Sequence, residues 1–452
     1  MSRHPLVAHR RLADVVAYRK GQPITVGHFL ADVDRIAGDF PPGGFVLNAC
    51  VDRYRFAVGL AAALVAGKVS LLPANLAPET VKALKERHAS LVCLADSDQS
   101  SLGVPQLRFR DAAPGAAPST GAIPEIDAAR PVAWLFTSGS TGEPVAHLKT
   151  WGALVRNVGI EAERLGLRGD HGEVIVATVP PQHSYGLESS VLVAMQGAVA
   201  FSAARPFYPI DICAALAEVP RPRVLVSTPF HLRLLLESGA TIPALDLVVS
   251  ATAPLDPALV SAVEERCSAP LLEIYGSTDT GQIASRRPSA TAEWRLFDGV
   301  TLVPEDDRTW ASGGHVGAPV VLNDVVEVIG DDRFLLLGRS TDLVNIAGKR
   351  SSLAFLTHQL GAIPGVLDGV YFMPEEHAAD GAGVRRLAAA AVAPGLAAGD
   401  LLRALRLRID PVFLPRPLLL VDALPRNATG KLTREALLDL VGRRSKRSLE
   451  QG

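Results

Sequence analysis

Residues 136–145 read FTSGSTGEPV and directly follow the apolar run 132–135. This order predicts a buried strand that ends in a phosphate-binding loop, because the glycines let backbone N–H groups converge and the hydroxyls add donors. A polar turn between two elements is the alternative for such a loop on its own, so other parts of the chain have to decide. The residues expected at the phosphates are Thr137, Ser138, Gly139, Ser140, Thr141 and Gly142.

This loop differs from a Walker motif, in which four residues separate the glycines and a lysine directly follows the second glycine. Here Glu143 and Pro144 follow Gly142, which disfavours ordinary P-loop kinases and NTPases. We expect backbone N–H groups and hydroxyls to meet the phosphate charge, with Lys149 as the nearest substitute cation.

A second strand with a similar ending covers residues 271–279, which read LLEIYGSTD. The carboxyl ends of parallel strands are where such sheets bind ligands, so this turn is expected at the same site as the loop. Asp279 supplies a carboxylate, and carboxylate oxygen is a ligand that Mg²⁺ accepts. For this segment alone, a capped turn leading to the next element is the alternative.

Short apolar runs alternate with helical patterns along much of the chain, and this order predicts an α/β fold with helix-covered parallel sheets. The Ala-, Pro- and Gly-rich stretch 111–130 is expected to be a loop or linker. The predicted helices are 55–67, 78–88, 231–237 and 257–267, and the predicted strands are 69–72, 91–94, 174–179, 223–227, 245–250 and 271–275.

The pattern changes near Gly338, where a predicted hairpin over 327–337 gives way to helices expected at 351–360, 400–409 and 433–441. A chain of 452 residues exceeds what a single core usually holds. We therefore predict a large N-terminal domain over 1–338, a hinge at 339–341 and a small α+β domain over 342–452.

The charge balance and the cysteines limit the possible partners and the compartment. There are 45 Lys and Arg against 47 Asp and Glu, so no overall charge attracts nucleic acid or an anionic membrane. The four cysteines lie far apart, as in a protein that keeps its thiols reduced. With neither a signal peptide nor a long apolar span, the sequence favours a cytoplasmic protein that binds no membrane.

Both Gly/Ser/Thr turns resemble motifs of the adenylate-forming superfamily, which includes acyl-CoA synthetases, peptide-synthetase adenylation domains and luciferases. That superfamily writes the loop as TSG(S/T)TGxPK, so Val145 stands here in place of its lysine. Further resemblance comes from NDVVEVIGDDRFLLLGR at 323–339, GRSTDLVNIAGKR at 338–350 and LPRNATGK at 424–431. These motifs follow the superfamily's order over residues 131–434, which implies its two-domain fold with a small mobile C-terminal domain.

The resemblance implies a role for each matching residue. Tyr275 and Gly276 would contact adenine, Thr278 the α-phosphate and Asp279 the Mg²⁺ ion, so ATP and Mg²⁺ are the expected cofactors. Asp324 would bind the ribose hydroxyls and Arg339 the ribose or phosphate. Lys431 would be the catalytic lysine, because a mobile ammonium offsets the repulsion between the substrate carboxylate and the α-phosphate.

Residues 180–186, PPQHSYG, match the superfamily segment that borders the acyl pocket. In that resemblance His183 gates the pocket and has a catalytic part, and a neutral Ser184 disfavours α-amino acids, which need a carboxylate for their ammonium group. An aromatic acid is therefore the expected substrate. The residues expected to line its pocket are His183, Ser184, Ser227, Ser250 and Thr252.

At a finer level, the segments IYGSTDTGQIASR and VNIAGKRSSL resemble aryl-acid ligases of bacterial aryl-polyene pigment pathways. That resemblance implies transfer of a hydroxybenzoate to the phosphopantetheine thiol of an acyl carrier protein. Two alternatives remain open from the sequence. One is an acyl-CoA synthetase for a short-chain, medium-chain or aryl acid that uses free CoA, and the other is a non-catalytic nucleotide-binding protein.

Overall fold

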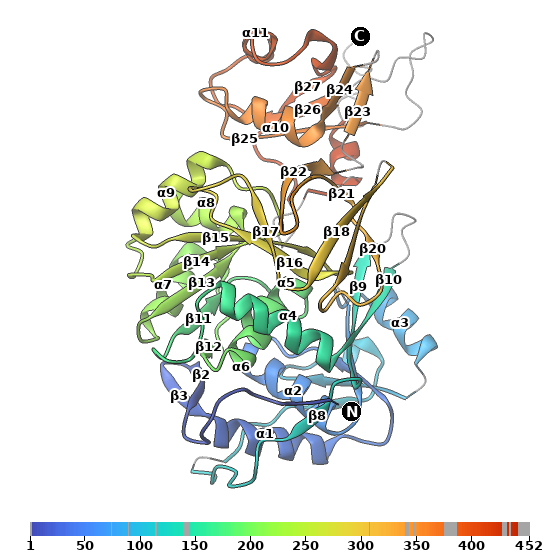
Figure 1. Cartoon of the computed structure of the whole chain (residues 1–452), viewed down its shortest axis with the longest axis vertical. Coiled ribbons are helices and arrows are strands. Elements are labelled where there is room, and N and C mark those ends of the chain that lie inside the picture. Colours follow the sequence, from blue (N-terminus) through green and yellow to red (C-terminus); the bar gives the residue numbers. More distant parts are fainter. Residues whose placement is uncertain are drawn as a thin grey trace. The chain divides into compact units, whose positions relative to one another are not determined.

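The computed structural model describes residues 2–73, 75–88, 90–113, 115–138, 144–306, 308–339, 343–346, 349–374, 387–426, 432–433 and 435–441. The chain forms two compact units (Figure 1). The first comprises residues 1–303, 310–320 and 330–333, and the second comprises 304–309, 321–329 and 334–452. The predicted hinge at 339–341 stays a prediction.

The first unit contains a sheet in the order β10-β9-β5-β4-β6-β7, in which the strands other than β10 pair in parallel. Its strands are β4 (Phe45–Asn48), β5 (Val69–Leu72), β6 (Leu91–Ala95), β7 (Gln106–Arg108), β9 (Pro131–Ser138) and β10 (Pro144–Thr150). Helices α2 (Arg53–Val65) and α3 (Pro78–Arg87) follow β4 and β5. Asp52 starts α2 by accepting a hydrogen bond from the Arg55 N–H, and Pro78 is favourable in the first turn of α3.

A larger sheet of the first unit runs in the order β17-β16-β15-β14-β13-β11-β12-β2-β3, and its strands from β15 to β2 pair in parallel. Figure 1 shows helices α7, α8 and α9 together on one side of this sheet, where their apolar faces build a core with alternate residues of the strands. The strands are β2 (Val15–Arg19), β3 (Gln22–Thr25), β11 (Val174–Ala177), β12 (Ala200–Ser202), β13 (Arg223–Ser227), β14 (Leu247–Ser250), β15 (Leu271–Ser277), β16 (Gly281–Arg286) and β17 (Trp294–Leu296). The helices are α7 (Pro209–Ala217), α8 (Pro229–Glu237) and α9 (Pro257–Cys267).

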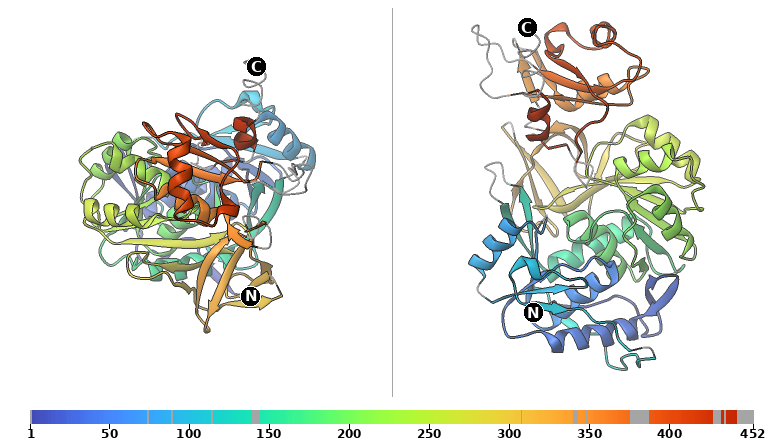
Figure 2. Two further views of the ribbon diagram at one scale, coloured as in Figure 1. Left: turned by 90° about the horizontal axis from the view of Figure 1, so that it is seen from above. Right: turned by 180° about the vertical axis from the view of Figure 1, so that it is seen from behind.

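Further helices complete this unit. The α1 helix (Val26–Asp39) packs along α2 (Figure 2), where the Tyr54 hydroxyl donates to Asp32 over 2.8 Å. The remaining elements are α4 (Trp151–Arg164), α5 (Ser184–Gly186), a π-helix at Leu187–Leu192, α6 (Val193–Gln196), a 3₁₀ turn at Ser100–Leu102, β1 (Arg3–Pro5) and β8 (Glu125–Asp127). Three more strands belong partly to the first unit and partly to the second, namely β18 (Val300–Glu305), β19 (Arg308–Gly313) and β20 (Val320–Val321).

The second unit is a small α+β fold. Its core combines α10, α11 and the sheet β25-β26-β27. The elements are β21 (Asp324–Ile329), β22 (Arg333–Arg339), β23 (Leu343–Ile346), β24 (Lys349–Ser352), α10 (Leu353–Gly361), β25 (Asp368–Phe372), β26 (Ala388–Val392), α11 (Ala398–Arg406), a 3₁₀ turn at Pro411–Phe413, β27 (Leu418–Leu420) and a helix over residues 435–441.

The predicted α/β class is confirmed, and most predicted elements lie within a few residues of their observed positions. One expectation was wrong, because the stretch 111–130 contains β8, which pairs antiparallel with β1 near the N-terminus. The four cysteines are unpaired thiols, as expected. Among the described residues, no helix combines the length and the apolar character that crossing a bilayer requires.

Candidate active site

The predicted phosphate loop lies between two antiparallel strands. β9 ends at Ser138, β10 begins at Pro144, and Thr137 pairs with Val145 across the two strands. The predicted residues Gly139, Ser140, Thr141 and Gly142 lie outside the described residues. Thr137 is described, and its Oγ1 atom lies 2.9 Å from Nε2 of His147 on β10.

The second predicted motif forms the end of β15 and its turn into β16. Tyr275 and Gly276 belong to β15, whereas Thr278 and Asp279 lie in the turn. Ser277 and Thr280 close the turn, since each side-chain oxygen accepts a hydrogen bond from the other residue's backbone N–H. A Cβ atom on Gly276 would lie 2.2 Å from the carbonyl oxygen of Gly281, so this position requires glycine.

His147 connects these two motifs. Its Nδ1 atom lies 2.7 Å from Oδ1 of Asp279, while its Nε2 atom faces Thr137. Lys149 lies two residues further along β10 and is buried, with its ammonium 3.5 Å from the backbone oxygen of Asp279. The structure thus brings together Thr137 and Asp279, which the sequence predicted as parts of one site.

A buried carboxylate holds the predicted acyl loop. Ser184 donates to Glu188 over 2.8 Å, and Asn157 on α4 donates to the other carboxylate oxygen over 2.9 Å. Burial raises the pKa of Glu188, and the charge of Lys149 and the hydrogen bond from Ser184 act against this rise. Gly186 closes the loop, because a Cβ atom there would lie 2.0 Å from the carbonyl oxygen of Pro180.

A second buried carboxyl lies close to Glu188. Burial raises the pKa of Glu161 on α4 to about 8; the neighbouring Ser189 lowers it, and the Glu188 charge raises it further. At neutral pH Glu161 is therefore mostly protonated, because a buried negative charge beside another carboxylate is costly.

The remaining predicted acyl residues lie at the carboxyl ends of β13 and β14. Ser227 and Ser250 are cross-strand partners and are buried. The Ser227 hydroxyl lies 3.0 Å from that of Thr178, and the Tyr185 hydroxyl donates to the backbone oxygens of Ser227 and Val249. Thr252 is exposed and has a φ of +79°. Positive φ in a β-branched residue marks a strained backbone, and such strain is concentrated at ligand sites.

Other predicted residues belong to the second unit. Asp324 is the first residue of β21, and Arg339 is the last residue of β22. Lys431 lies outside the described residues. The predicted roles of all three stay predictions.

Asp279 fits the predicted Mg²⁺ ion as a single-carboxylate ligand. Its side chain is 33% exposed. The oxygen that faces His147 is Oδ1, so the oxygen considered for the metal ion is Oδ2. No cluster of three or more potential metal ligands occurs among the described residues. Mg²⁺ commonly binds through one or two carboxylates together with substrate phosphates and water, so one aspartate is compatible with that arrangement.

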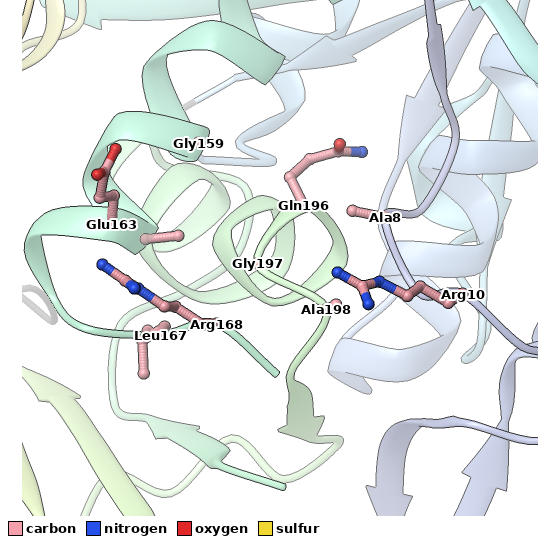
Figure 3. Close-up of a pocket in the computed structure, with 10 residues that line it drawn as sticks. Ala8, Arg10, Gly159, Glu163, Leu167, Arg168, Gln196, Gly197 and Ala198 are labelled. Atoms are coloured by element: carbon pink, nitrogen blue, oxygen red, sulfur yellow. The ribbon is translucent and has the colours of Figure 1, made fainter. Parts of the chain in front are cut away.

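A surface hollow of about 330 Å³ lies elsewhere in the first unit (Figure 3). Its lining includes Arg10 of the N-terminal segment, Glu163 of α4, Gln196 of α6, and Arg168, which follows α4 in the sequence. None of the predicted phosphate or acyl residues lines this hollow, and we assign it no part in the site.

Comparison with known proteins agrees with the fold. A model of the AMP-binding enzyme family matches residues 46–336. A 4-coumarate–CoA ligase of Rhodobacter capsulatus is 31% identical over 232 residues, which cover 51% of this chain and 57% of that protein. A 3-hydroxybenzoate–CoA ligase of an Aromatoleum species is 25% identical, with 95% of this chain and 94% of that protein covered. The crystal structure of ATP-bound MatB from Rhodopseudomonas palustris has a TM-score of 0.80 at 19% identity, with coverages of 94% and 95%.

The fold is that of the matched MatB structure, and the sequence prediction of this two-domain α/β fold is confirmed. The chain belongs to the AMP-binding enzyme family. Both curated relatives are acid–CoA ligases by name, which agrees with the predicted class of acid–thiol ligase. The match spans little more than half of the Rhodobacter relative.

Sequence reasoning missed three residues of this region, namely His147, Asn157 and Glu188. For His147 a signal was available, because alternate residues of a strand face the same side. Val145, His147 and Lys149 therefore share one face of β10. Of the two nitrogen-bearing side chains among them, His147 lies nearer to the loop along the strand than Lys149 does. The roles of Asn157 and Glu188 depend on tertiary contacts that no local pattern reveals.

Replacing Thr252 by glycine should stabilise the protein. Removing the strain of the positive φ should raise the free energy of unfolding by about 1–3 kcal/mol. The greater entropy of glycine in the unfolded chain should lower that free energy by about 0.5–1 kcal/mol. We expect a net gain of about 1 kcal/mol in the urea-extrapolated free energy of unfolding, with an unchanged m-value. Thr241→Gly, at an exposed position without positive φ, should lose stability. A loss of stability in Thr252→Gly would contradict the assignment of strain.

Replacing Glu161 by glutamine should stabilise the protein by an amount that grows with pH. The folded carboxyl, with its pKa of about 8, keeps its proton up to about pH 8, whereas the unfolded one loses it near the ordinary glutamate pKa of 4.5. Wild-type stability therefore falls as pH rises between these values, and the neutral glutamine escapes that loss. Unfolding free energies at pH 5, 6.5 and 8 measure the effect, with the exposed Glu163→Gln on the same helix as control. A difference that is constant over this range would refute the raised pKa.

Proposed function

We propose that this protein uses ATP to convert an aromatic carboxylic acid into an acyl adenylate and then transfers the acyl group to the thiol of CoA. The observation that carries the proposal is the connection of Thr137 to Asp279 through His147, in a member of the AMP-binding enzyme family. It joins the end of β9, which precedes the hydroxyl-rich loop in the sequence, to the carboxylate turn. A site of that chemistry suits the polyphosphate of ATP.

In the first half-reaction, a carboxylate oxygen of the acid attacks the α-phosphorus of ATP and pyrophosphate leaves. The loop hydroxyls and Thr278 donate to phosphate oxygens, and Arg339 and Asp324 bind the ribose region in this proposal. Lys431 supplies the ammonium that lies between the two reacting anions. Mg²⁺, held by Asp279, would neutralise charge on the phosphates.

In the second half-reaction, the thiol sulfur attacks the carbonyl carbon of the adenylate. The thiol loses its proton, a thioester forms and AMP leaves with the bonding electron pair. We propose that the second unit turns about residues 339–341 between the two steps, as the family resemblance implies.

An aromatic acid is favoured because both curated relatives carry the names of aryl-acid ligases. His183 and Ser184 border the proposed pocket. The carboxylate nearest to Ser184 is Glu188, and both of its oxygens already accept hydrogen bonds. A substrate ammonium would therefore have to displace existing partners, which supports an acid without an α-amino group.

CoA is favoured as acceptor because the same relatives are CoA ligases. Transfer to an acyl carrier protein in pigment synthesis rests on the resemblance of a few segments, and none of the relatives above supports it. We therefore treat the carrier protein as an alternative outcome of the experiment that follows.

ATP–pyrophosphate exchange with benzoate, hydroxybenzoates, cinnamates and fatty acids tests the first half-reaction. We expect exchange with one or more aryl acids, followed by thioester formation when free CoA is supplied. A phosphopantetheinylated carrier protein offered in parallel tests the other acceptor. Exchange with fatty acids only would overturn the aryl assignment, and ATP binding without exchange over the whole panel would favour a non-catalytic protein.

Lys431→Ala should lose adenylation by several orders of magnitude and keep most of its affinity for ATP, because the ammonium acts on the reacting groups. Pyrophosphate exchange measures the first property and calorimetry with MgATP the second. Lys82→Ala, at an exposed position of α3, serves as the charge-matched control. Full exchange in the Lys431 variant with the cognate acid would overturn the proposed role.

A further inference from the structure

One face of β10 places three side chains beside the phosphate loop. Val145, His147 and Lys149 alternate along the strand, and Thr137 on β9 is the direct cross-strand partner of Val145. The Val145 side chain is apolar and the residue is 48% exposed. The polar contact with Thr137 is instead made diagonally by His147, which lies two residues further along β10 than Val145.

Lys149 is buried beside the turn that carries Asp279. Its residue is 9% exposed, its ammonium lies 3.5 Å from the backbone oxygen of Asp279, and its charge acts on the buried Glu188. The charge of Lys149 therefore acts on a buried carboxylate inside the first unit. The sequence expectation of Lys149 as substitute cation for the loop stays a prediction.

His147 is held on both sides of its ring. One nitrogen lies 2.7 Å from the Asp279 carboxylate and the other 2.9 Å from the Thr137 hydroxyl. The histidine side chain is 16% exposed, so protein surrounds most of the ring. Because the two partners come from different sheets, a shift of either strand end would break one of the two contacts.

We propose that His147 is a positioning residue for the polyphosphate of ATP, which orients the Thr137 hydroxyl and the Asp279 carboxylate at the same time. The inference rests on the proposed function and adds a residue to it. An imidazole suits this task because it presents two nitrogens at opposite sides of a rigid ring. The contact with Asp279 also selects which carboxylate oxygen remains for a metal ion or its water.

Three substitutions separate the two contacts. His147→Asn keeps a polar atom near the Nδ1 position and so keeps the contact with Asp279. His147→Gln keeps one near the Nε2 position and so keeps the contact with Thr137. His147→Ala removes both, and His171→Ala, at an exposed loop position, is the matched control.

Calorimetric titration with ATP, without acid and with Mg²⁺ varied, provides a readout that needs no turnover. We expect His147→Ala to weaken MgATP binding about tenfold, which corresponds to about 1.4 kcal/mol, and to raise the Mg²⁺ concentration needed for half-maximal binding. Steady-state assays should show a higher KM for ATP with a nearly unchanged KM for the acid. Asn and Gln should each recover part of the loss.

Double-mutant cycles with Thr137→Val and Asp279→Asn test the coupling, and we expect strongly non-additive losses in MgATP affinity. Thermal unfolding of each variant separates loss of fold from loss of positioning. Wild-type affinity and an unchanged Mg²⁺ requirement in a folded His147→Ala variant would overturn this inference alone. A wild-type protein that binds no nucleotide would overturn the proposed function, and this inference with it.

Discussion

The side chain of Arg53 is fully buried, and the position of the acyl loop depends on the hydrogen bonds that its two terminal nitrogens donate. It donates to the Ser190 hydroxyl over 2.7 Å and to the backbone oxygens of Ala177 and Val179 over 2.8 and 2.9 Å. Burial lowers its pKa to about 9, and the charge of Arg205 adds to this effect. A buried cation that lost these partners would cost several kcal/mol. One side chain at the start of α2 thus anchors both ends of residues 180–186, because its acceptors lie just before and after that loop.

The same requirement for buried partners connects the acyl loop to the YGSTD turn. Glu188 accepts from Ser184 on the loop side and from Asn157 on α4. Gly281, at the start of β16, has no room for a Cβ atom, which would lie 2.3 Å from the Asn157 amide nitrogen. A substitution at any of these positions should therefore affect both the acyl loop and the turn that carries Asp279.

Local sequence signals predicted those elements whose ends depend on local chemistry. Helix α9 has its predicted bounds, because Asp256 caps its first turn, Pro257 suits that turn, and Ser268 leaves the helix with positive φ. The β8 strand was missed, since its three residues are stabilised by distant β1. The same holds for the site. The two Gly/Ser/Thr turns can be recognised in contiguous sequence, whereas the contact of His147 with Asp279 forms only when the two sheets pack together.

The buried charges of the first unit are arranged so that few of them oppose an anionic substrate. Lys149, Ser184 and Asn157 all favour the ionised form of Glu188, and its charge in turn helps to keep the neighbouring Glu161 protonated. Glu161 is therefore mostly protonated at neutral pH, and the charge of Lys149 acts against the burial that raises the pKa of Glu188. Asp279 is the more exposed carboxylate, and it is both paired with His147 and placed to meet a divalent cation. In this arrangement a polyphosphate would meet hydroxyls, backbone N–H groups and an imidazole, while the buried carboxylates contribute little net repulsion.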